Sequence, residues 1–136
     1  MDDHAARGEV LEWLEQFADC VRRRDFAGAE PLFNARVVAF GTRNEVLENL
    51  SELRERQWRP TWQTTRDFRF LADTVHVELS ATGADAWATA LWTSIGEPGD
   101  RPAFDRRGRA TFILRRAGGR WQCIHSHLSL MPVGLS

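Results

Sequence analysis

The chain has 136 residues, of which 43% are hydrophobic and 27% charged, and its formal net charge is -1 at pH 7. This size and composition predict one globular domain with a buried core and exclude a disordered chain. The near-neutral charge gives no general attraction to nucleic acid or to an anionic membrane. Apolar runs fall short of the roughly 20 residues that cross a bilayer, and the N-terminus is not a signal peptide. Cys20 and Cys123 suggest no disulfide framework, so a cytoplasmic location is the default expectation.

The first part of the chain predicts helices. Apolar residues recur at spacings of three and four over residues 10–21, which is typical of a helix with one buried face. A short helix is expected from Asp25, followed by a strand over residues 37–42 that is rich in β-branched and aromatic side chains. The part of the sequence before residue 43 therefore predicts two helices and one strand.

A third helix is expected from Val46 to about Pro60, with Thr42 and Glu45 at the spacing of a capping box. After it the apolar period changes to two, which indicates strands. The order of helices followed by strands predicts an α+β fold, with an antiparallel sheet that curls around the first helix and encloses a pocket. The expected strands are WQTTRDFRFL, TVHVELSAT, AWATALWTSI, RATFILRR and WQCIHSHLSL.

Several of these strands are apolar on both faces. In AWATALWTSI, Trp87 and Leu91 point one way, whereas Ala88, Ala90 and Trp92 point the other. An antiparallel sheet with one wet face should alternate more cleanly between apolar and polar residues. We therefore expect a homodimer in which the outer face of the sheet packs against a second copy.

The last strand carries two histidines, His125 and His127. Side chains on one face of a strand recur at roughly 6.5–7 Å, so Trp121, Cys123, His125, His127 and Ser129 are expected in one row. If the AGG turn reverses the chain, Thr111 falls near His125, and Arg109 falls near His127. This amphipathic row, with Arg109 and Thr111 beside it, predicts the wall of a cavity.

Three interpretations of the histidines stay open. A metal site needs a third ligand, and no such ligand follows from the spacing of other residues, so no metal or cofactor is expected. An acid–base role is favoured by a neutral-range pKa and by a nearby arginine in an apolar pocket. The plain alternative is that both imidazoles hydrogen-bond to neighbours and shape the pocket without chemistry.

The other arginine runs, Arg106–Arg107 among them, are expected in solvated turns and strand ends.

Five segments carry a resemblance to a known family: VVAFGT with NEVLENL behind it, GADAWATA, RATFILRR and GRWQCIHSHLSLMP. Over roughly residues 8–132 the chain resembles the SnoaL-like domains of the nuclear transport factor 2-like superfamily, so residues 1–136 are interpreted as one such domain. The last segment is also similar to the end of the association domain of calcium/calmodulin-dependent kinase, with its W-x-x-x-H-x-H-x-S pattern. The resemblance implies a cone-shaped α+β fold, and that superfamily includes isomerases, cyclases, dehydratases, ligand binders and association modules.

The resemblance does not predict a particular reaction for this chain. The steroid isomerase branch uses an Asp base and a Tyr–Asp oxyanion hole, whereas this chain has no tyrosine and carries Gly41 where SnoaL-like relatives often have an acid. The kinase association domain has pocket arginines, and Trp92 stands where one of these is expected. Arg109 is the nearest arginine that remains on these strands.

The sequence therefore predicts a pocket for a small apolar or aromatic organic ligand, with isomerase, cyclase or dehydratase activity if the protein is an enzyme. His125 and His127 are the candidate acid–base pair, and Arg109 would bind a carboxylate, enolate or phenolate-like group. The alternative is a non-catalytic association or accessory module that uses the sheet face. The candidate ligand-binding residues are Arg109, Thr111, Trp13, Phe17, Phe40, Trp58 and Trp92.

Overall fold

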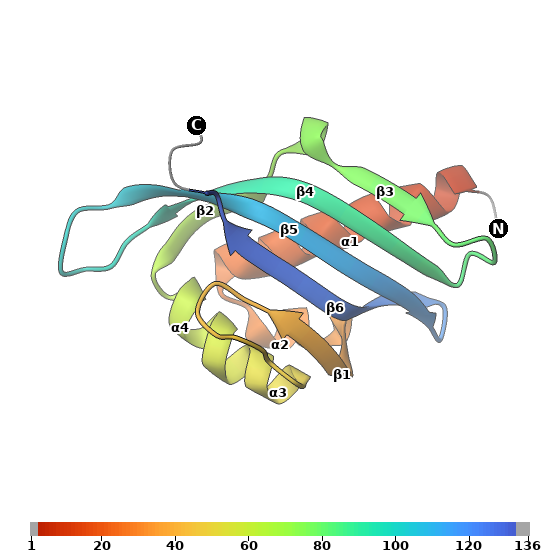
Figure 1. Cartoon of the computed structure of the whole chain (residues 1–136), viewed down its shortest axis with the longest axis horizontal. Helices are drawn as coiled ribbons and strands as arrows, with labels where there is room; N and C mark the ends of the chain where they lie inside the picture. The colour runs from red at the N-terminus through yellow and green to blue at the C-terminus, as the bar shows by residue number, and fades with distance from the viewer. Residues whose placement is uncertain (1–2, 133–136) are drawn as a thin grey trace.

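The computed structural model describes residues 3–132. A curved sheet of six strands covers one long helix, and a second group of short helices closes the lower end of the sheet (Figure 1). This arrangement confirms the predicted α+β cone. The elements in chain order are α1 (Asp3–Arg23), α2 (Phe26–Ala29), η1 (Glu30–Leu32), β1 (Phe33–Phe40), α3 (Leu50–Glu52), η2 (Leu53–Trp58), α4 (Arg59–Trp62), β2 (Thr65–Phe70), η3 (Ala72–Thr74), β3 (His76–Leu79), β4 (Asp85–Gly96), β5 (Phe104–Ala117) and β6 (Arg120–Leu130).

Helix α1 forms because one face of it is apolar over five turns. Val10, Leu14 and Phe17 are buried on that face, and Arg22 and Arg23 lie in the last turn, where positive charge interacts favourably with the helix dipole. No helix within residues 3–132 is long and apolar enough to cross a membrane. The apolar face of α1 instead packs against the inner face of the sheet.

The strand order is β1-β6-β5-β4-β2, and β3 pairs with the other half of the β4 edge. The long strands β4, β5 and β6 pair antiparallel, as the sequence predicts. Strand β1 departs from the expected antiparallel sheet because it runs parallel to β6. Parallel neighbours need a long connection, and here residues 41–119 lie between them.

The third helix begins later than its apolar pattern predicts. Asn49, and not Thr42, caps it, because the Asn49 side chain accepts a hydrogen bond from the backbone N–H of Glu52. Leu47 lies before the helix and exchanges two backbone hydrogen bonds with Ala39, of 2.8 and 2.9 Å. The helix also continues through Pro60 to Trp62, with the proline in the first turn of α4. Thr42 is thereby free to face the interior.

The last strand contains a β-bulge that the sequence analysis missed. Cys123 pairs with Leu114, but His125 pairs with Ile113, so Ile124 is an extra residue. One extra residue turns the following side chains to the opposite face of the sheet. The predicted single row from Trp121 to Ser129 is therefore wrong, because Trp121 and Cys123 face the core and both histidines face outward.

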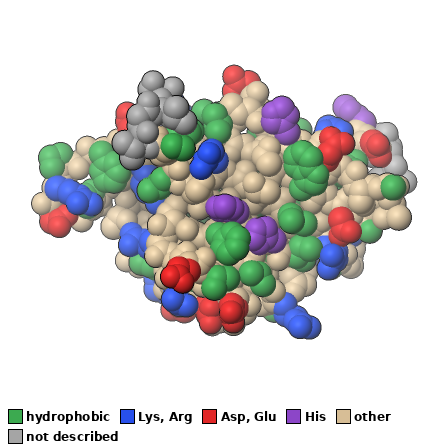
Figure 2. Space-filling view, in the orientation of Figure 1, with side chains coloured by type: hydrophobic (Ala, Val, Ile, Leu, Met, Phe, Trp, Pro, Cys, Tyr) green, Lys and Arg blue, Asp and Glu red, His purple; other side chains and the backbone are tan. Residues whose placement is uncertain are grey.

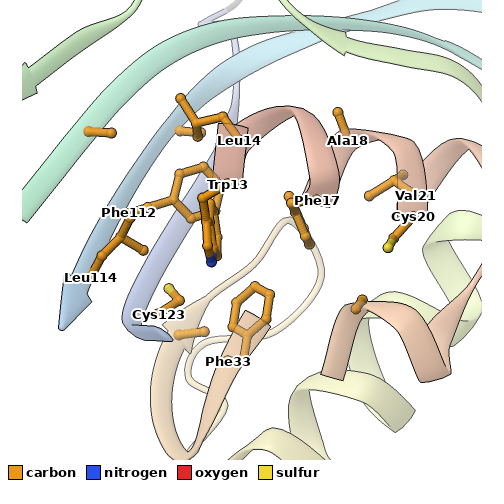
Figure 3. Close-up of a cluster of buried hydrophobic side chains, with 14 of the residues drawn as sticks. Trp13, Leu14, Phe17, Ala18, Cys20, Val21, Phe33, Phe112, Leu114 and Cys123 are labelled. Carbon is orange, nitrogen blue, oxygen red and sulfur yellow. The ribbon is translucent and has the colours of Figure 1, made fainter. Parts of the chain in front are cut away.

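The core is an aromatic cluster between α1 and the sheet (Figure 3). The ring of Trp13 lies 5.0 Å from that of Phe112 and 5.5 Å from that of Phe33, centroid to centroid. Its indole N–H donates to the carbonyl of Leu32 at 3.1 Å, so this buried donor is satisfied. Burial raises the pKa of the Cys123 thiol, which keeps it protonated in the core.

Candidate functional site

A hollow opens between the short helices and the end of the sheet. It measures about 540 Å³ when its open mouth is included, and about 40 Å³ of this is open to the centre of a water molecule. The residues that line it are Phe17, Val21, Phe40, Gly41, Thr42, Leu53, Gln57, Trp58, Thr61, Trp62, Thr65, Phe68, Trp92, Arg106, Ser126 and Leu128.

Flat aromatic surfaces dominate the lining. Trp58 and Trp62 stack at 4.8 Å with 20° between their planes, because they stand four residues apart on one helical segment. Phe17 of α1 lies 6.1 Å from Trp58 and 6.0 Å from Trp62, centroid to centroid. Phe68 of β2 lies 5.5 Å from Trp92. A planar apolar group in the hollow would find rings on several sides.

The polar side of the lining is a chain of hydrogen bonds. Arg106 donates to the hydroxyl of Thr42 at 2.9 Å, and Gln57 donates to the same oxygen at 2.8 Å. The Gln57 carbonyl oxygen accepts from the backbone N–H of Arg43 at 3.2 Å. Arg43 in turn donates from Nε to the hydroxyl of Thr61 at 2.7 Å. Two arginines are thereby fixed at the mouth through neutral side chains.

Arg106 lies partly inside the protein. Its guanidinium carbon is 5.3 Å from the centroid of the Trp92 ring, a cation–π distance. Burial lowers the pKa of Arg106, and the neighbouring Arg43 lowers it further. Trp92 itself is buried, and its Nε1 has no hydrogen-bond acceptor among the described residues. The site thus holds a desolvated cation and an unsatisfied donor side by side.

Gly108 makes room for the Trp92 ring. A Cβ atom at this position would overlap the indole of Trp92 and the backbone oxygen of Ser129. Because β5 carries no side chain here, the Cζ2 and Cε2 atoms of the indole can approach the strand closely. The glycine therefore sets the place of the ring over which Arg106 is held.

A second space, which we call the vestibule, adjoins the hollow near the hairpin that joins β4 to β5. Thr61, Thr65 and Arg106 line both spaces, so Arg106 lies at the boundary between them. The vestibule measures about 780 Å³ with its open mouth included, and about 370 Å³ of this is open to the centre of a water molecule. The other residues on its wall are Arg43, Thr64, Gly96, Glu97, Pro98, Asp100, Arg101 and Phe104.

Comparison with known families accounts for this architecture. The family of the SnoaL-like domain matches residues 10–134. This chain belongs to that family. No curated protein matches it in sequence.

Solved structures share the fold of this SnoaL-like domain. A nuclear transport factor 2-like protein of unknown function from Pseudomonas putida is 28% identical, with a TM-score of 0.77 over 93% of this chain and 87% of that one. A Xanthomonas campestris protein named as a calcium/calmodulin-dependent protein kinase II association domain is 17% identical, with a TM-score of 0.79 over 92% and 87%. A Novosphingobium aromaticivorans protein named as a scytalone dehydratase is 10% identical, with a TM-score of 0.82 over 98% and 97%. The last two show the fold alone.

Of the aromatic residues predicted for the pocket, all but Trp13 border the hollow. Phe17, Phe40, Trp58 and Trp92 line the hollow of this SnoaL-like domain. Trp13 does not, because its ring is enclosed by Phe33 and Phe112 in the core and lies beside a separate surface groove. The Phe40 ring itself stands on the outer face, between His125 and His127, so Phe40 only borders the hollow. The aromatic wall therefore contains three of the predicted residues, Phe17, Trp58 and Trp92, together with Trp62 and Phe68.

The predicted polar residues lie elsewhere. His125 pairs with Ile113 and His127 with Thr111, so the expected register is displaced by two residues and Arg109 lies opposite Ser129. All four predicted polar residues face outward from the sheet, away from the hollow. The expectation that they form the cavity wall is wrong: the bulge at Ile124 turns both histidines outward, and the alternation of β5 turns Arg109 and Thr111 outward. The His125 Nδ1 lies 2.7 Å from the carbonyl oxygen of Val38, and this contact orients its ring on the outer face.

Arg106, an inner polar residue, was missed because it was assigned to a solvated turn. Strand β5 begins at Phe104, five residues before its predicted start, and this places Arg106 in a strand. The strand alternates, so Arg106 shares the inner face with Gly108, Ala110 and Phe112. Extending the period of two backward from Phe112 would have found Arg106. No comparable signal marks Gln57 or Ser126.

The outer face of the sheet forms a second surface, which we call the outer patch (Figure 2). Trp87 is 43% exposed there, Val38 41% and Phe40 40%. The Phe40 ring stands edge-on between the two imidazoles, 5.4 Å from His125 and 5.3 Å from His127. Half-buried Ile113 and Leu91 join the patch from β5 and β4. This face is more apolar than a solvated sheet face requires.

Proposed function

We propose that this SnoaL-like domain binds a small, planar, apolar or aromatic organic molecule in its hollow. The lining carries the proposal: stacked indoles and phenyl rings on one side, and hydrogen-bond donors at the mouth. Ligand pockets combine such an apolar wall with a few polar groups that orient the ligand. The relation to proteins named as dehydratase and ketosteroid isomerase-like supports a small-molecule site of this kind.

The volume of the hollow limits the ligand. The deep space of about 40 Å³ holds a few water molecules, whereas a cavity of roughly 150 Å³ is needed to take up benzene. A ligand with a six-membered ring must therefore extend toward the mouth, past Leu128 and Arg106. Its polar end then lies at the boundary with the vestibule.

The lining favours binding over acid–base catalysis. Among the described lining residues there is no Asp, Glu, His, Cys, Tyr or Lys. Isomerisation and dehydration need a group that gives or takes a proton near neutral pH, within hydrogen-bond reach of the substrate. Arginine keeps its proton in proteins. We therefore propose a carrier or sensor of a small molecule in preference to a cyclase, isomerase or dehydratase.

A cavity-filling variant tests the proposal. Leu128→Phe places a larger side chain into the hollow, whereas Leu130→Phe, on the same strand, adds the same bulk at a site that is 47% exposed. Thermal unfolding is measured with phenol, indole and benzoate. We expect at least one of these to raise the melting temperature of the native chain and of Leu130→Phe, because ligands that bind only the folded state stabilise it. Leu128→Phe should lose this gain. Equal gains in both variants, or none with the native chain, would contradict the proposal.

The outer patch favours a second function, self-association. We propose that two copies pack their sheet faces together, so that Trp87, Val38 and Phe40 become buried. The polar positions inside the patch are filled by threonine, histidine and Arg109, and Glu78, the β3 partner of Trp87, lies at its edge. Removing this apolar area from water would drive association.

Sedimentation of charged variants tests the association. Trp87→Glu should convert dimer to monomer, because it leaves a carboxylate unpaired in the interface. Leu11→Glu is the matched control, since Leu11 is 46% exposed on α1, behind the sheet. A monomeric mass for the native chain at micromolar concentration would refute the dimer and leave the hollow as the only proposed site.

A further inference from the structure

We propose that the ligand of the hollow is a carboxylate, and that its acid group binds between Arg106 and Arg43 while its ring lies against the tryptophans. This inference rests on the proposed function and narrows it to aromatic acids. It assigns the recognition to the boundary between the hollow and the vestibule, where the hydrogen-bonded chain runs from Arg106, which lines both spaces, to Arg43, which lines the vestibule.

Two positive charges, Arg106 and Arg43, are held near each other without a counter-charge. No ion pair between described residues involves Arg106 or Arg43. Their side chains donate to the hydroxyls of Thr42 and Thr61 and to the Pro60 carbonyl, all of them neutral. A guanidinium has five N–H donors, and Arg106 uses one of them in its hydrogen bond to Thr42.

The burial of Arg106 is energetically unfavourable. Burial of a cation is costly unless an anion or several acceptors compensate it. Arg106 is placed over the Trp92 ring, which compensates only in part. The lowered pKa of Arg106 has the same two causes, burial and the charge of Arg43. An anion at the mouth would offset the repulsion between the two arginines, and its charge and hydrogen bonds would compensate the burial of Arg106. The two cations without counter-charge therefore favour a negatively charged ligand.

The carboxylates of the vestibule do not fill this role. Glu97 is paired with Arg66 at 3.0 Å, on the side of β2. Asp100 lies in the exposed hairpin between β4 and β5, together with Arg101, which adds a further positive charge to the vestibule. Neither acid is within ion-pair distance of Arg106 or Arg43 by the contacts of the described residues.

The indole of Trp92 offers a further hydrogen-bond donor at this site. Its Nε1 is buried without an acceptor among residues 3–132. A buried donor without a partner costs free energy, so a ligand that brings an acceptor atom gains affinity. Carboxylate oxygens accept from both arginine and indole donors. The planar fork of arginine also matches a carboxylate in two parallel hydrogen bonds.

The size and aromatic lining of the hollow favour an aromatic acid over a bare anion as its ligand. A free oxyanion would leave the stacked rings of Trp58 and Trp62 in contact with no ligand atoms. A ring with a carboxylate attached reaches both the apolar wall and the arginines, because its bulk must extend toward the mouth. Benzoate is the smallest molecule with this shape.

Isothermal titration of the full chain tests the inference with three probes: benzoate, its neutral isostere benzamide, and inorganic phosphate. Benzoate should bind at least about tenfold more tightly than benzamide, since charge-assisted hydrogen bonds are stronger than neutral ones. Arg106→Gln and Arg43→Gln should each weaken benzoate by about tenfold and leave benzamide unchanged. Arg107→Gln is the matched control, because Arg107 is the next residue of β5 and faces outward.

The possible outcomes separate the two proposals. If benzoate and benzamide bind equally, and Arg106→Gln changes neither, the hollow binds rings but the carboxylate inference is wrong. If phosphate binds as tightly as benzoate, the site recognises a bare oxyanion and the inference is again wrong. If none of the three probes binds the native chain, the carboxylate inference is wrong, and the proposed function fails with it only if phenol and indole also give no gain in melting temperature. Arg106→Lys guards against a folding defect, because it keeps the charge and should bind benzoate more tightly than Arg106→Gln does.

Discussion

The contact of Gly108 with Trp92 gives the most direct test of how the mouth is built. In Gly108→Ala, the new methyl group overlaps both the indole of Trp92 and the main-chain oxygen of Ser129. The indole can tilt, but the oxygen belongs to the neighbouring strand and can move only if the β5–β6 pairing distorts. Overpacking of a well-packed core by a methyl group costs about 1–3 kcal/mol. With two obstacles, one of them main chain, we expect a loss of about 2–3 kcal/mol in the free energy of unfolding.

Urea unfolding followed by tryptophan fluorescence measures this loss. For a domain of this size, each kcal/mol lowers the melting temperature by about 3–4 °C, so the expected drop is about 6–12 °C. Gly8→Ala is the control, because Gly8 lies exposed in α1 with no heavy atom near its added Cβ. Alanine is the better helix former, so this variant should gain up to about 1 kcal/mol.

A double variant identifies the obstacle. In a Trp92→Leu background the clash with the indole disappears while that with the Ser129 oxygen remains. The cost of Gly108→Ala should then fall by about 1 kcal/mol, as a coupling between neighbouring residues. If Gly108→Ala in the native background costs less than about 0.5 kcal/mol, or if its cost is the same in both backgrounds, the packing of Trp92 on Gly108 is not what places the ring.

Three further predictions follow from the described contacts. Cys20 and Cys123 are buried, and burial raises the pKa of both thiols, so neither should react with a disulfide reagent at neutral pH until denaturant is added. A hydrogen bond from Arg116 lowers the pKa of Glu9, so ionised Glu9 stabilises the fold above its unfolded-state pKa of about 4.3. This contribution is lost as the pH falls through the lower native pKa; the melting temperatures of native and Glu9→Gln chains should therefore converge in acid. His127→Ala should leave ligand-induced stabilisation intact, since His127 lies on the outer face, and loss of the gain would place its imidazole in the binding site.

The fold was largely predictable because its strongest signals are local. The period of α1 depends only on residues 10–21, and its buried face is the predicted one. The alternation of β4 likewise places Trp87 and Leu91 outward and Trp92 inward, as predicted. Such patterns reflect burial of one face of each element, which the sequence records residue by residue.

The errors have a different physical origin, since they depend on residues far apart in the chain. Strand β1 is long because it pairs with β6, some 90 residues later, and β6 follows it in parallel. Leu47 fits the helical period, yet it pairs with Ala39 as an extended residue, so tertiary contact overrides local preference there. Thr42 has the spacing of a helix cap but accepts hydrogen bonds from Arg106 and Gln57 in the hollow.

The bulge at Ile124 determines which chemistry faces the hollow. With continuous pairing, His125 would lie opposite Phe112 on the inner face, and an imidazole would point among the aromatic rings. The extra residue instead brings Ser126 opposite Phe112 and Leu128 opposite Ala110, so a hydroxyl and an aliphatic chain line the hollow. The histidines move to the outer patch, where His125 is oriented by the Val38 carbonyl. A one-residue insertion thus separates the two imidazoles from the ligand space, which favours a site that binds an anion through arginine over one that transfers protons.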